Sequence, residues 1–120
     1  GIIIGQKNSA PVNQEAVKCS SGALLRIPIC KETNLVHTLK ELRRLGFRLI
    51  GADEKSSSTL DEMDMNQPIV FIFGAEGEGI SRELKNQIDI FVKIPQVGQI
   101  NSLNVSVSSA IFFYEWMRRK

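Results

Sequence analysis

The sequence contains few cysteines, and their positions argue against a cysteine-based site. Cys19 and Cys30 form neither a C-x-x-C pair nor a cluster with histidine, so neither a metal site nor a disulfide framework is indicated. We therefore expect two free thiols, buried as cysteine side chains usually are, in a protein of the reducing cytosol.

Long apolar runs and an excess of one charge are also missing. No apolar stretch approaches the roughly 18 residues that span a bilayer, and residues 2–4 lack the basic flank and cleavage site of a signal peptide. The 15 basic and 13 acidic side chains give a net charge of +2, so any nucleic-acid affinity must be local. The 120 residues suffice for one compact domain, which we expect to be cytoplasmic.

Apolar strands alternate with helical patterns along the chain. Runs typical of β-strands occur at residues 2–4, 26–29, 47–52, 69–73 and 90–94. Because these runs are mostly apolar and do not alternate regularly with polar residues, they are typical of a parallel sheet that helices cover on both faces. The sequence thus predicts an α/β fold with a parallel sheet.

The clearest helix covers residues 35–45, where leucines recur at helical spacing and charged side chains can face water. Thr33 or Asn34 can cap its start, and Gly46 can end it in the left-handed conformation. Residues 53–66 are polar and predict an exposed connection with at most one short turn.

The last segment, residues 104–120, carries apolar side chains on more than one face of any helix that it forms. Packing on its own sheet would leave some of them uncovered. We therefore expect a second buried surface, supplied by the same helix of another subunit in a two-fold homodimer. The alternative is a helix sunk in its own domain.

A glycine-rich loop at residues 73–81 follows a predicted strand and precedes a helical pattern. Gly74, Gly77 and Gly79 permit tight turning and close approach of the backbone to a ligand. Ligands of parallel sheets bind at the carboxyl ends of the strands, where this loop falls. A tight turn without a ligand remains the alternative.

Phosphate-binding loops do not match this segment. The orders G-x-x-x-x-G-K-S/T and G-x-G-x-x-G are both absent, and Glu76 and Glu78 would repel phosphates. The loop therefore suits a ligand without phosphates, such as S-adenosylmethionine, which carries a sulfonium cation and a free amine.

A second loop, residues 94–106, links a predicted buried strand to the last helix through Pro, Gly and small polar residues. It should lie beside the first loop at the same sheet edge, and together the two loops indicate a pocket. Ser102, Asn104 and Ser106 can each cap the last helix, which is their alternative, structural role.

The two loops carry a resemblance to a known family. The pair G-x-E-G-x-G-I-S and I-P-x-x-G-x-x-x-S-L-N-V-S resembles the second and third motifs of the SpoU/TrmH family of SPOUT RNA 2′-O-ribose methyltransferases, with the family's spacing. Residues 1–22 are similar to the family in their pattern of strand, polar loop and short helix. Within the family, the sequence most resembles RlmB-type enzymes, which modify a guanosine of rRNA.

The resemblance implies an RNA methyltransferase that uses S-adenosylmethionine as cofactor and acts on the ribose 2′-hydroxyl of a guanosine in rRNA, or alternatively of tRNA. It also implies a C-terminal trefoil knot, which no sequence periodicity could indicate. Gly74, Ile94 and Leu103 match positions whose backbone holds the cofactor.

Further residues of the site follow from the same resemblance. Glu76, Ser102 and Asn104 match polar positions that shape the active site and position catalytic groups. Lys7 and Asn8, in the first polar loop, are the candidates for contact with single-stranded RNA, although Lys7 would equally fit an ordinary solvated lysine.

One motif of the family is missing. Its catalytic arginine lies in an N-x-G-x-x-x-R pattern before the first strand, and no such pattern occurs in residues 1–120. We interpret the chain as a methyltransferase domain that lacks its first strand and helix. The alternatives are a noncatalytic RNA-binding or dimerisation module and, third, a nucleotide-binding α/β protein. Gln96, where many relatives have Met, should alter packing more than chemistry.

Overall fold

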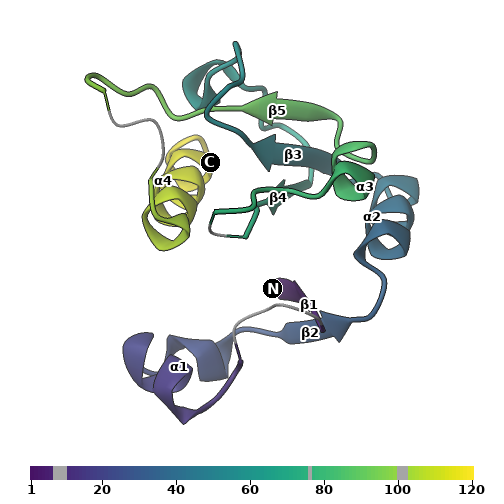
Figure 1. The fold of residues 1–120 in the computed structure, drawn as a ribbon, viewed down its shortest axis with the longest axis vertical. Coiled ribbons are helices and arrows are strands. Elements are labelled where there is room, and N and C mark those ends of the chain that lie inside the picture. The colour runs from purple at the N-terminus through teal and green to yellow at the C-terminus, as the bar shows by residue number, and fades with distance from the viewer. Residues whose placement is uncertain (7–10, 76, 100–102) are drawn as a thin grey trace. The chain divides into compact units, whose positions relative to one another are not determined.

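Strands and helices alternate along the chain in the computed structural model, which describes residues 1–6, 11–75, 77–99 and 103–120 (Figure 1). The chain forms two compact units, residues 1–38 and 39–120. The strands pair in two parallel ladders, which consist of β1 (Ile2–Gly5) with β2 (Ile29–Glu32), and of β4 (Ile69–Ile72), β3 (Arg48–Ala52) and β5 (Ile90–Val92) in that order.

The first unit contains β1 and β2 with two short helices between them, α1 (Gln14–Cys19) and η1 (Ala23–Arg26). The strand predicted at 26–29 begins only at Ile29, so that prediction is wrong by three residues. Pro28 has no N–H to offer to a strand ladder. Its carbonyl instead accepts a hydrogen bond of 2.9 Å from Ile2 N, and the regular pairing starts with Ile2 opposite Ile29.

The two cysteines are free, as predicted, but the expectation that they are buried is wrong, because both are exposed. Cys19 ends α1, a short helix with no buried side chain. The Cys30 thiol donates to Glu32 Oε1 at 3.0 Å, and this hydrogen bond to a carboxylate raises the pKa of the thiol. Among the described residues, no group of three or more His, Cys, Asp or Glu side chains could hold a metal ion.

Helix α2 (Leu35–Arg44) follows the predicted bounds to within one residue. Asn34 Oδ1 accepts a hydrogen bond of 3.1 Å from His37 N, which satisfies one of the free amides at the helix start. Gly46 has a φ of +97°, so the left-handed stop is confirmed.

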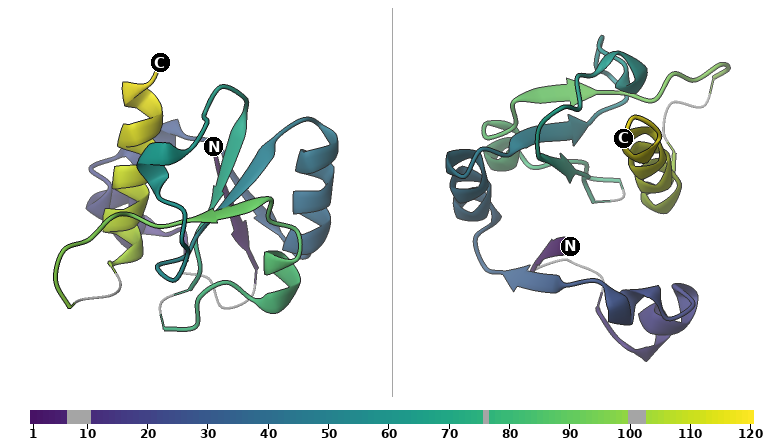
Figure 2. Two further views of the ribbon diagram at one scale, coloured as in Figure 1. Left: turned by 90° about the horizontal axis from the view of Figure 1, so that it is seen from above. Right: turned by 180° about the vertical axis from the view of Figure 1, so that it is seen from behind.

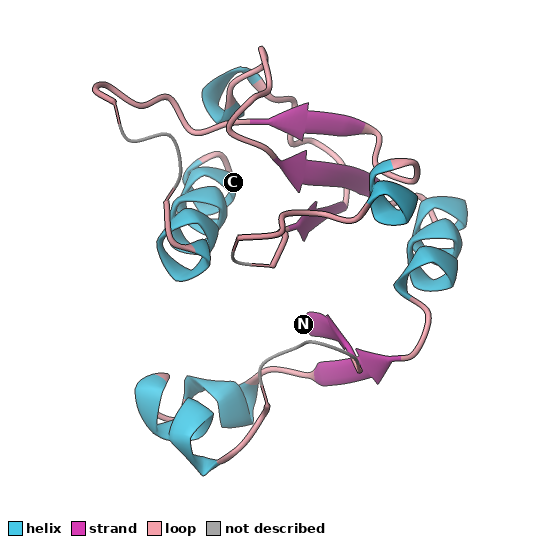
Figure 3. Ribbon diagram, in the orientation of Figure 1, coloured by secondary structure: helices cyan, strands magenta, loops and turns pink. Residues whose placement is uncertain are grey.

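The second unit is built around β3, the central strand of its ladder. The three arrows of this ladder point the same way (Figure 3). Leu49 and Ile50 have 0% exposure, which explains why this strand is apolar at successive positions. Asp89 precedes β5 and accepts a hydrogen bond of 2.7 Å from Leu49 N, while its other oxygen lies 3.2 Å from Arg43 Nε. Helix α3 (Arg82–Lys85) lies between β4 and β5 in the chain.

Helix α4 (Val105–Arg118) lies beside this ladder in both views of Figure 2. Its Phe112 is 1% exposed, and the ring meets those of Phe71 and Phe73 edge-on at 5.2 and 5.1 Å between centroids. Phe112 therefore joins α4 to β4 in the core of the unit.

The polar segment 53–66 is not the exposed connection that the sequence predicts. Leu60 and Met65 are 3% and 7% exposed, and Leu60 begins a turn of 3₁₀ helix, η2 (Leu60–Glu62). Hydrogen bonds of 2.9 Å from Leu60 N to Lys93 O and from Lys93 N to Ser58 O bind the segment to the end of β5. A few apolar side chains of this segment thus enter the core, and its backbone extends the ladder. Neither feature could be predicted from a segment whose composition is mostly polar.

The α/β class with parallel strands is confirmed, although the strands pair in two ladders where a single sheet was expected. In the part of the chain that the structure describes, no helix is long and apolar enough to cross a membrane.

Candidate functional site

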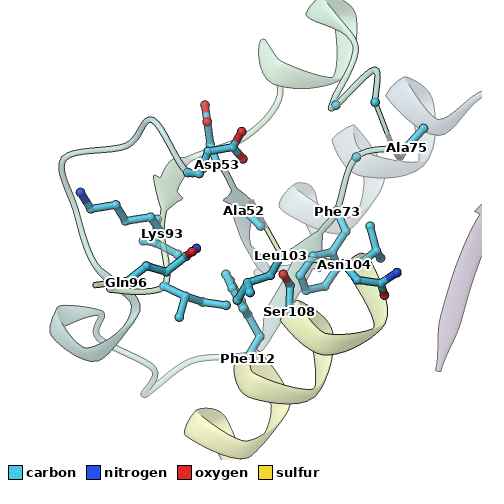
Figure 4. Close-up of a pocket in the computed structure, with 17 residues that line it drawn as sticks. Ala52, Asp53, Phe73, Ala75, Lys93, Gln96, Leu103, Asn104, Ser108 and Phe112 are labelled. Atoms are coloured by element: carbon cyan, nitrogen blue, oxygen red, sulfur yellow. The ribbon is translucent and has the colours of Figure 1, made fainter. Parts of the chain in front are cut away.

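A cavity of about 510 Å³ lies at the carboxyl ends of the second ladder. Ala52 ends β3, Val92 ends β5, and both contribute to its wall together with Phe73, which follows β4. The start of α4 closes another side (Figure 4). The site therefore occupies the position where open parallel sheets bind their ligands.

The glycine-rich loop forms one wall, through Gly74, Ala75, Gly77 and Gly79. The loop folds back on itself: Ala75 N donates to Gly79 O at 3.2 Å, and Gly79 N donates to Ala75 O at 2.8 Å. A Cβ atom on Gly74 would lie only 2.2 Å from the carbonyl carbon of Gly79. Glycine at position 74 is therefore required by the loop's own packing, and it leaves main chain rather than side chains at the cavity wall.

The segment before α4 forms the facing wall, with Ile94 and Leu103 among its residues. Asn104 is the N-cap of α4, and its Oδ1 accepts a hydrogen bond of 2.8 Å from Ser106 N. The capping role weighed from the sequence thus belongs to Asn104, which also lines the cavity. Figure 4 shows Leu103, Phe73 and Ser108 among the side chains that line the pocket.

The structure brings together four of the site residues that the sequence indicated, namely Gly74, Ile94, Leu103 and Asn104, which all line this cavity. Four others, Glu76, Ser102, Lys7 and Asn8, lie outside the described residues.

Several lining residues escaped the sequence-based prediction. Asp53 and Glu54 follow β3 directly, and one oxygen of Asp53 accepts a hydrogen bond of 2.9 Å from Lys55 N. Lys93 and Ser108 line the cavity as well. The signal that could have found the two acids is their place immediately after a predicted strand, at the edge where ligands bind.

Gln96, expected to act through packing, is also on the cavity wall. Its side chain is exposed, and Figure 4 shows it on the same side of the pocket as Lys93. The described titratable side chains of the wall are two carboxylates and one ammonium group, so they favour a ligand with positive charge over a phosphate.

Comparison with known proteins gives consistent results. Residues 1–114 match the SpoU rRNA Methylase family. A protein of Staphylococcus saprophyticus named as a TrmH family tRNA/rRNA methyltransferase is 37% identical over 120 residues, which are 100% of this chain and 48% of that protein. A protein of Mycobacterium avium named as a tRNA/rRNA methyltransferase is 39% identical over 120 residues, or 100% of this chain and 39% of that protein. The chain thus spans about half, or less, of the curated relatives that it matches.

Solved structures give the same result. The SpoU methyltransferase AviRb from Streptomyces viridochromogenes, in complex with the cofactor AdoMet, superposes with a TM-score of 0.87 at 25% identity, covering 99% of this chain and 47% of that one. An AdoMet-bound rRNA methyltransferase from Sinorhizobium meliloti gives a TM-score of 0.88 at 27% identity, covering 99% and 46%.

Proposed function

Because this chain belongs to the SpoU rRNA methylase family, with the TrmH-type proteins among its relatives, we propose that its pocket binds S-adenosylmethionine and serves an RNA 2′-O-ribose methyltransferase. The observation that carries the proposal is that the two loops with the family motifs line one and the same cavity. Proteins of similar fold hold AdoMet, at TM-scores of 0.87 and 0.88.

The residues of the pocket fit this cofactor. The volume of about 510 Å³ falls within the roughly 300 to 1,000 Å³ of small-molecule sites. Phe73 and Leu103 offer apolar surface that suits an adenine base, while Asp53 and Glu54 offer carboxylates that suit a sulfonium or an amine. Gly74 keeps one wall free of side chains, so that amides and carbonyls can meet polar groups of the ligand.

S-adenosylmethionine, when bound, supplies a methyl group on a positively charged sulfur that a hydroxyl oxygen can attack. The task of the chain is then mainly to hold the two reactants in line. Apolar side chains such as Phe73 and Leu103 exclude water, and Asn104, with Glu76 and Ser102 from the family motifs, provides polar groups around the hydroxyl.

The finer features of the proposal come from the motifs. The substrate that we propose is a guanosine of rRNA, with tRNA as the other candidate, and Lys7 and Asn8 contact the RNA. We place the protein in the cytoplasm, as a homodimer through α4, with a C-terminal trefoil knot. The family's catalytic arginine then comes from a part of the protein outside residues 1–120, since the curated relatives are about twice as long.

Calorimetric titration of the full-length protein with S-adenosylmethionine and S-adenosylhomocysteine tests the cofactor site. We expect both to bind and ATP not to bind. Binding of ATP alone would favour a nucleotide-binding α/β protein instead.

Transfer of a labelled methyl group to rRNA or tRNA fragments tests the reaction. Alkali cannot cleave the phosphodiester beside a 2′-O-methyl ribose, so labelled dinucleotides should survive hydrolysis. Labelled mononucleotides would point to base methylation and contradict the proposal.

Asn104 variants separate the site from helix capping. We expect Asn104→Asp to keep the cap and the thermal stability but to lose most methyl transfer, whereas Asn104→Ala should also cost about 0.5 to 2 kcal/mol of stability. Asn13→Ala is the control, because Asn13 is the N-cap of α1, where its Oδ1 accepts a hydrogen bond from Ala16 N, and it does not line the pocket. If Asn104→Asp kept full methyl transfer, Asn104 would have no role in the active site.

The second candidate function is a noncatalytic RNA-binding or dimerisation module, which the absence of an N-x-G-x-x-x-R pattern from the sequence favours. It predicts RNA binding without incorporation of methyl groups by the full-length protein. Reading the gene upstream of Gly1 for this pattern separates the two functions at once.

A further inference from the structure

Arg119, the C-cap residue that follows α4, contacts a part of the second unit that is distant in the sequence. Its Nη1 donates to Met63 O, and its Nη2 donates to Leu60 O at 3.2 Å and to Asp61 O. These carbonyls belong to η2 and the residue after it. Leu60 O also accepts a hydrogen bond of 3.2 Å from Met63 N, and the guanidinium adds further donors for the carbonyls at the end of this short helix.

Glu115 holds this guanidinium in place. Its Oε1 accepts a hydrogen bond of 2.9 Å from Arg119 Nε, and its side chain is only 14% exposed. Arg118 also binds Glu115, at 2.7 Å from Nη2, but its side chain is 56% exposed. The adjacent arginines therefore share one partner, while Arg119, at 23% exposure, also reaches across to η2.

Of the two elements that Arg119 joins, α4 lines the candidate pocket directly, and η2 belongs to segment 53–66, whose first residues line it. Helix α4 lines it through Val105, Ser108 and Phe112, and the segment that contains η2 begins with Asp53 and Glu54. The same segment is bound to the end of β5. Leu60 N donates to Lys93 O at 2.9 Å, and Ser56 Oγ donates to Phe91 O at 2.7 Å. Arg119 thus links α4 to η2 outside the residues that line the cavity, and η2 is in turn bound to the residue after β5 through Leu60 N.

We propose that Arg119 is a positioning residue, which fixes α4 against the η2 segment and so sets the spacing of the pocket walls. The proposal rests on the proposed function in that the pocket's ligand is taken to be S-adenosylmethionine. Arginine is required at this position because one planar group must serve carbonyls and a carboxylate together. The single ammonium of lysine cannot match that fork.

The test compares Arg119→Ala, Arg119→Lys and the matched control Arg118→Ala in the full-length protein. Thermal unfolding first defines a temperature at which all variants are folded. There, the Kd for S-adenosylhomocysteine should rise roughly three- to thirtyfold for Arg119→Ala and less for Arg119→Lys. For Arg118→Ala it should stay within about twofold. If Arg119→Ala is folded and less stable but its Kd is unchanged, Arg119 stabilises the fold without positioning the pocket walls, and the proposal is wrong.

Hydrogen exchange without ligand gives a second measurement that does not depend on the cofactor. Arg119→Ala should speed exchange at the amides of Lys93 and Ser108, which lie at the pocket, while Arg118→Ala should not. Faster exchange confined to η2 and the last turn of α4 would overturn the inference. If the wild-type protein binds no S-adenosylhomocysteine, the proposed function fails, and the exchange comparison still decides the role of Arg119. If Arg119→Ala does not fold, Arg119→Lys carries both measurements.

Discussion

Gly74 shows how a single missing side chain shapes this site. The backbone of Gly79 and Ile80 occupies the space where a Cβ atom on residue 74 would lie, at 2.2 to 2.6 Å from three main-chain atoms. Main chain cannot move aside as a flexible side chain can, so the glycine is demanded by close approach rather than by its φ angle.

We therefore predict that Gly74→Ala lowers the free energy of unfolding by about 1 to 3 kcal/mol and weakens cofactor binding. Gly77→Asn is the control in the same loop. Gly77 has a φ of +81°, and no atom lies within 4 Å of the place that a Cβ atom would take. Asparagine adopts that conformation more readily than other residues with a side chain, so this variant should lose less stability than Gly74→Ala. Urea denaturation measures both. Equal stability of the two variants would contradict the steric argument.

At the scale of elements, segment 53–66 determines more of the second unit than its composition indicates. Leu60, Met63 and Met65 enter the core cluster beside Ile50 and Phe112. The segment thereby forms part of the packed interior, and through Asp53 it also reaches the pocket.

Truncation of Leu60 should show this directly. Leu60→Ala removes a side chain that is 3% exposed, and we expect it to cost about 2 to 5 kcal/mol of unfolding free energy. Leu45→Ala, at a position that is 64% exposed, should stay within about 0.5 kcal/mol of the wild type. Chemical denaturation of the two variants under the same conditions compares them. A small loss for Leu60→Ala would restore the view of an exposed connection.

Glu115, which pairs with the two arginines at the end of α4, should give a pH-dependent contribution to stability. The hydrogen bond from Arg118 has the largest effect on the pKa of Glu115. Desolvation opposes it, the hydrogen bond from Arg119 adds to it, and together with the charges of both arginines the net result lowers this pKa from 4.5 to about 2. A carboxyl whose folded pKa lies below its unfolded value stabilises the fold above the unfolded pKa. That contribution is lost as the pH falls from about 4.5 to about 2.

Glu115→Gln should therefore melt a few degrees below the wild type near neutral pH, and the difference should shrink as the pH falls through this window. Arg118→Ala should show the same trend, because it removes a partner of the same carboxylate. Thermal melts between pH 7 and pH 2 measure both variants. If the difference in melting temperature stays constant with pH, the ion pairs with Glu115 do not lower the pKa of its carboxyl group.

The elements differ in how far the sequence could predict them. Helix α2 was predictable because its leucine spacing, its Asn34 cap and its Gly46 stop all agree. Segment 53–66 was not, since its buried residues are few and follow no period. The two loops of the pocket could be placed at one sheet edge from strand order alone. Asp53 and Glu54 follow β3 at that same edge, but they were missed because the polar composition of segment 53–66 indicated an exposed connection.

At the scale of the whole molecule, α4 has two faces with different roles. The inner face includes Ser108, Phe112 and Arg119, which contact the pocket, the core and η2. The opposite face carries a stripe at helical spacing that is exposed and apolar, consisting of Val107, Ala110, Tyr114 and Met117. Tyr114 and Met117 are 63% and 64% exposed, so the inner packing leaves most of their surface in water.

The homodimer that we propose would cover this stripe with the same stripe of a second subunit, because two-fold symmetry brings identical surfaces together. Tyr114→Glu and Met117→Glu place a charge in that contact, where an unpaired buried carboxylate is costly, so each should convert a dimer into a folded monomer. Size-exclusion chromatography with light scattering of the full-length protein gives the mass.

Val97→Glu is the control, since Val97 is fully exposed on the loop before α4 and lies outside the stripe. It should leave the mass unchanged. A wild-type monomer, or a dimer that survives both stripe substitutions, would contradict a homodimer through this face of α4. Since α4 also forms a wall of the pocket through Ser108, the monomeric variants should in addition bind S-adenosylhomocysteine more weakly if the contact stiffens that wall.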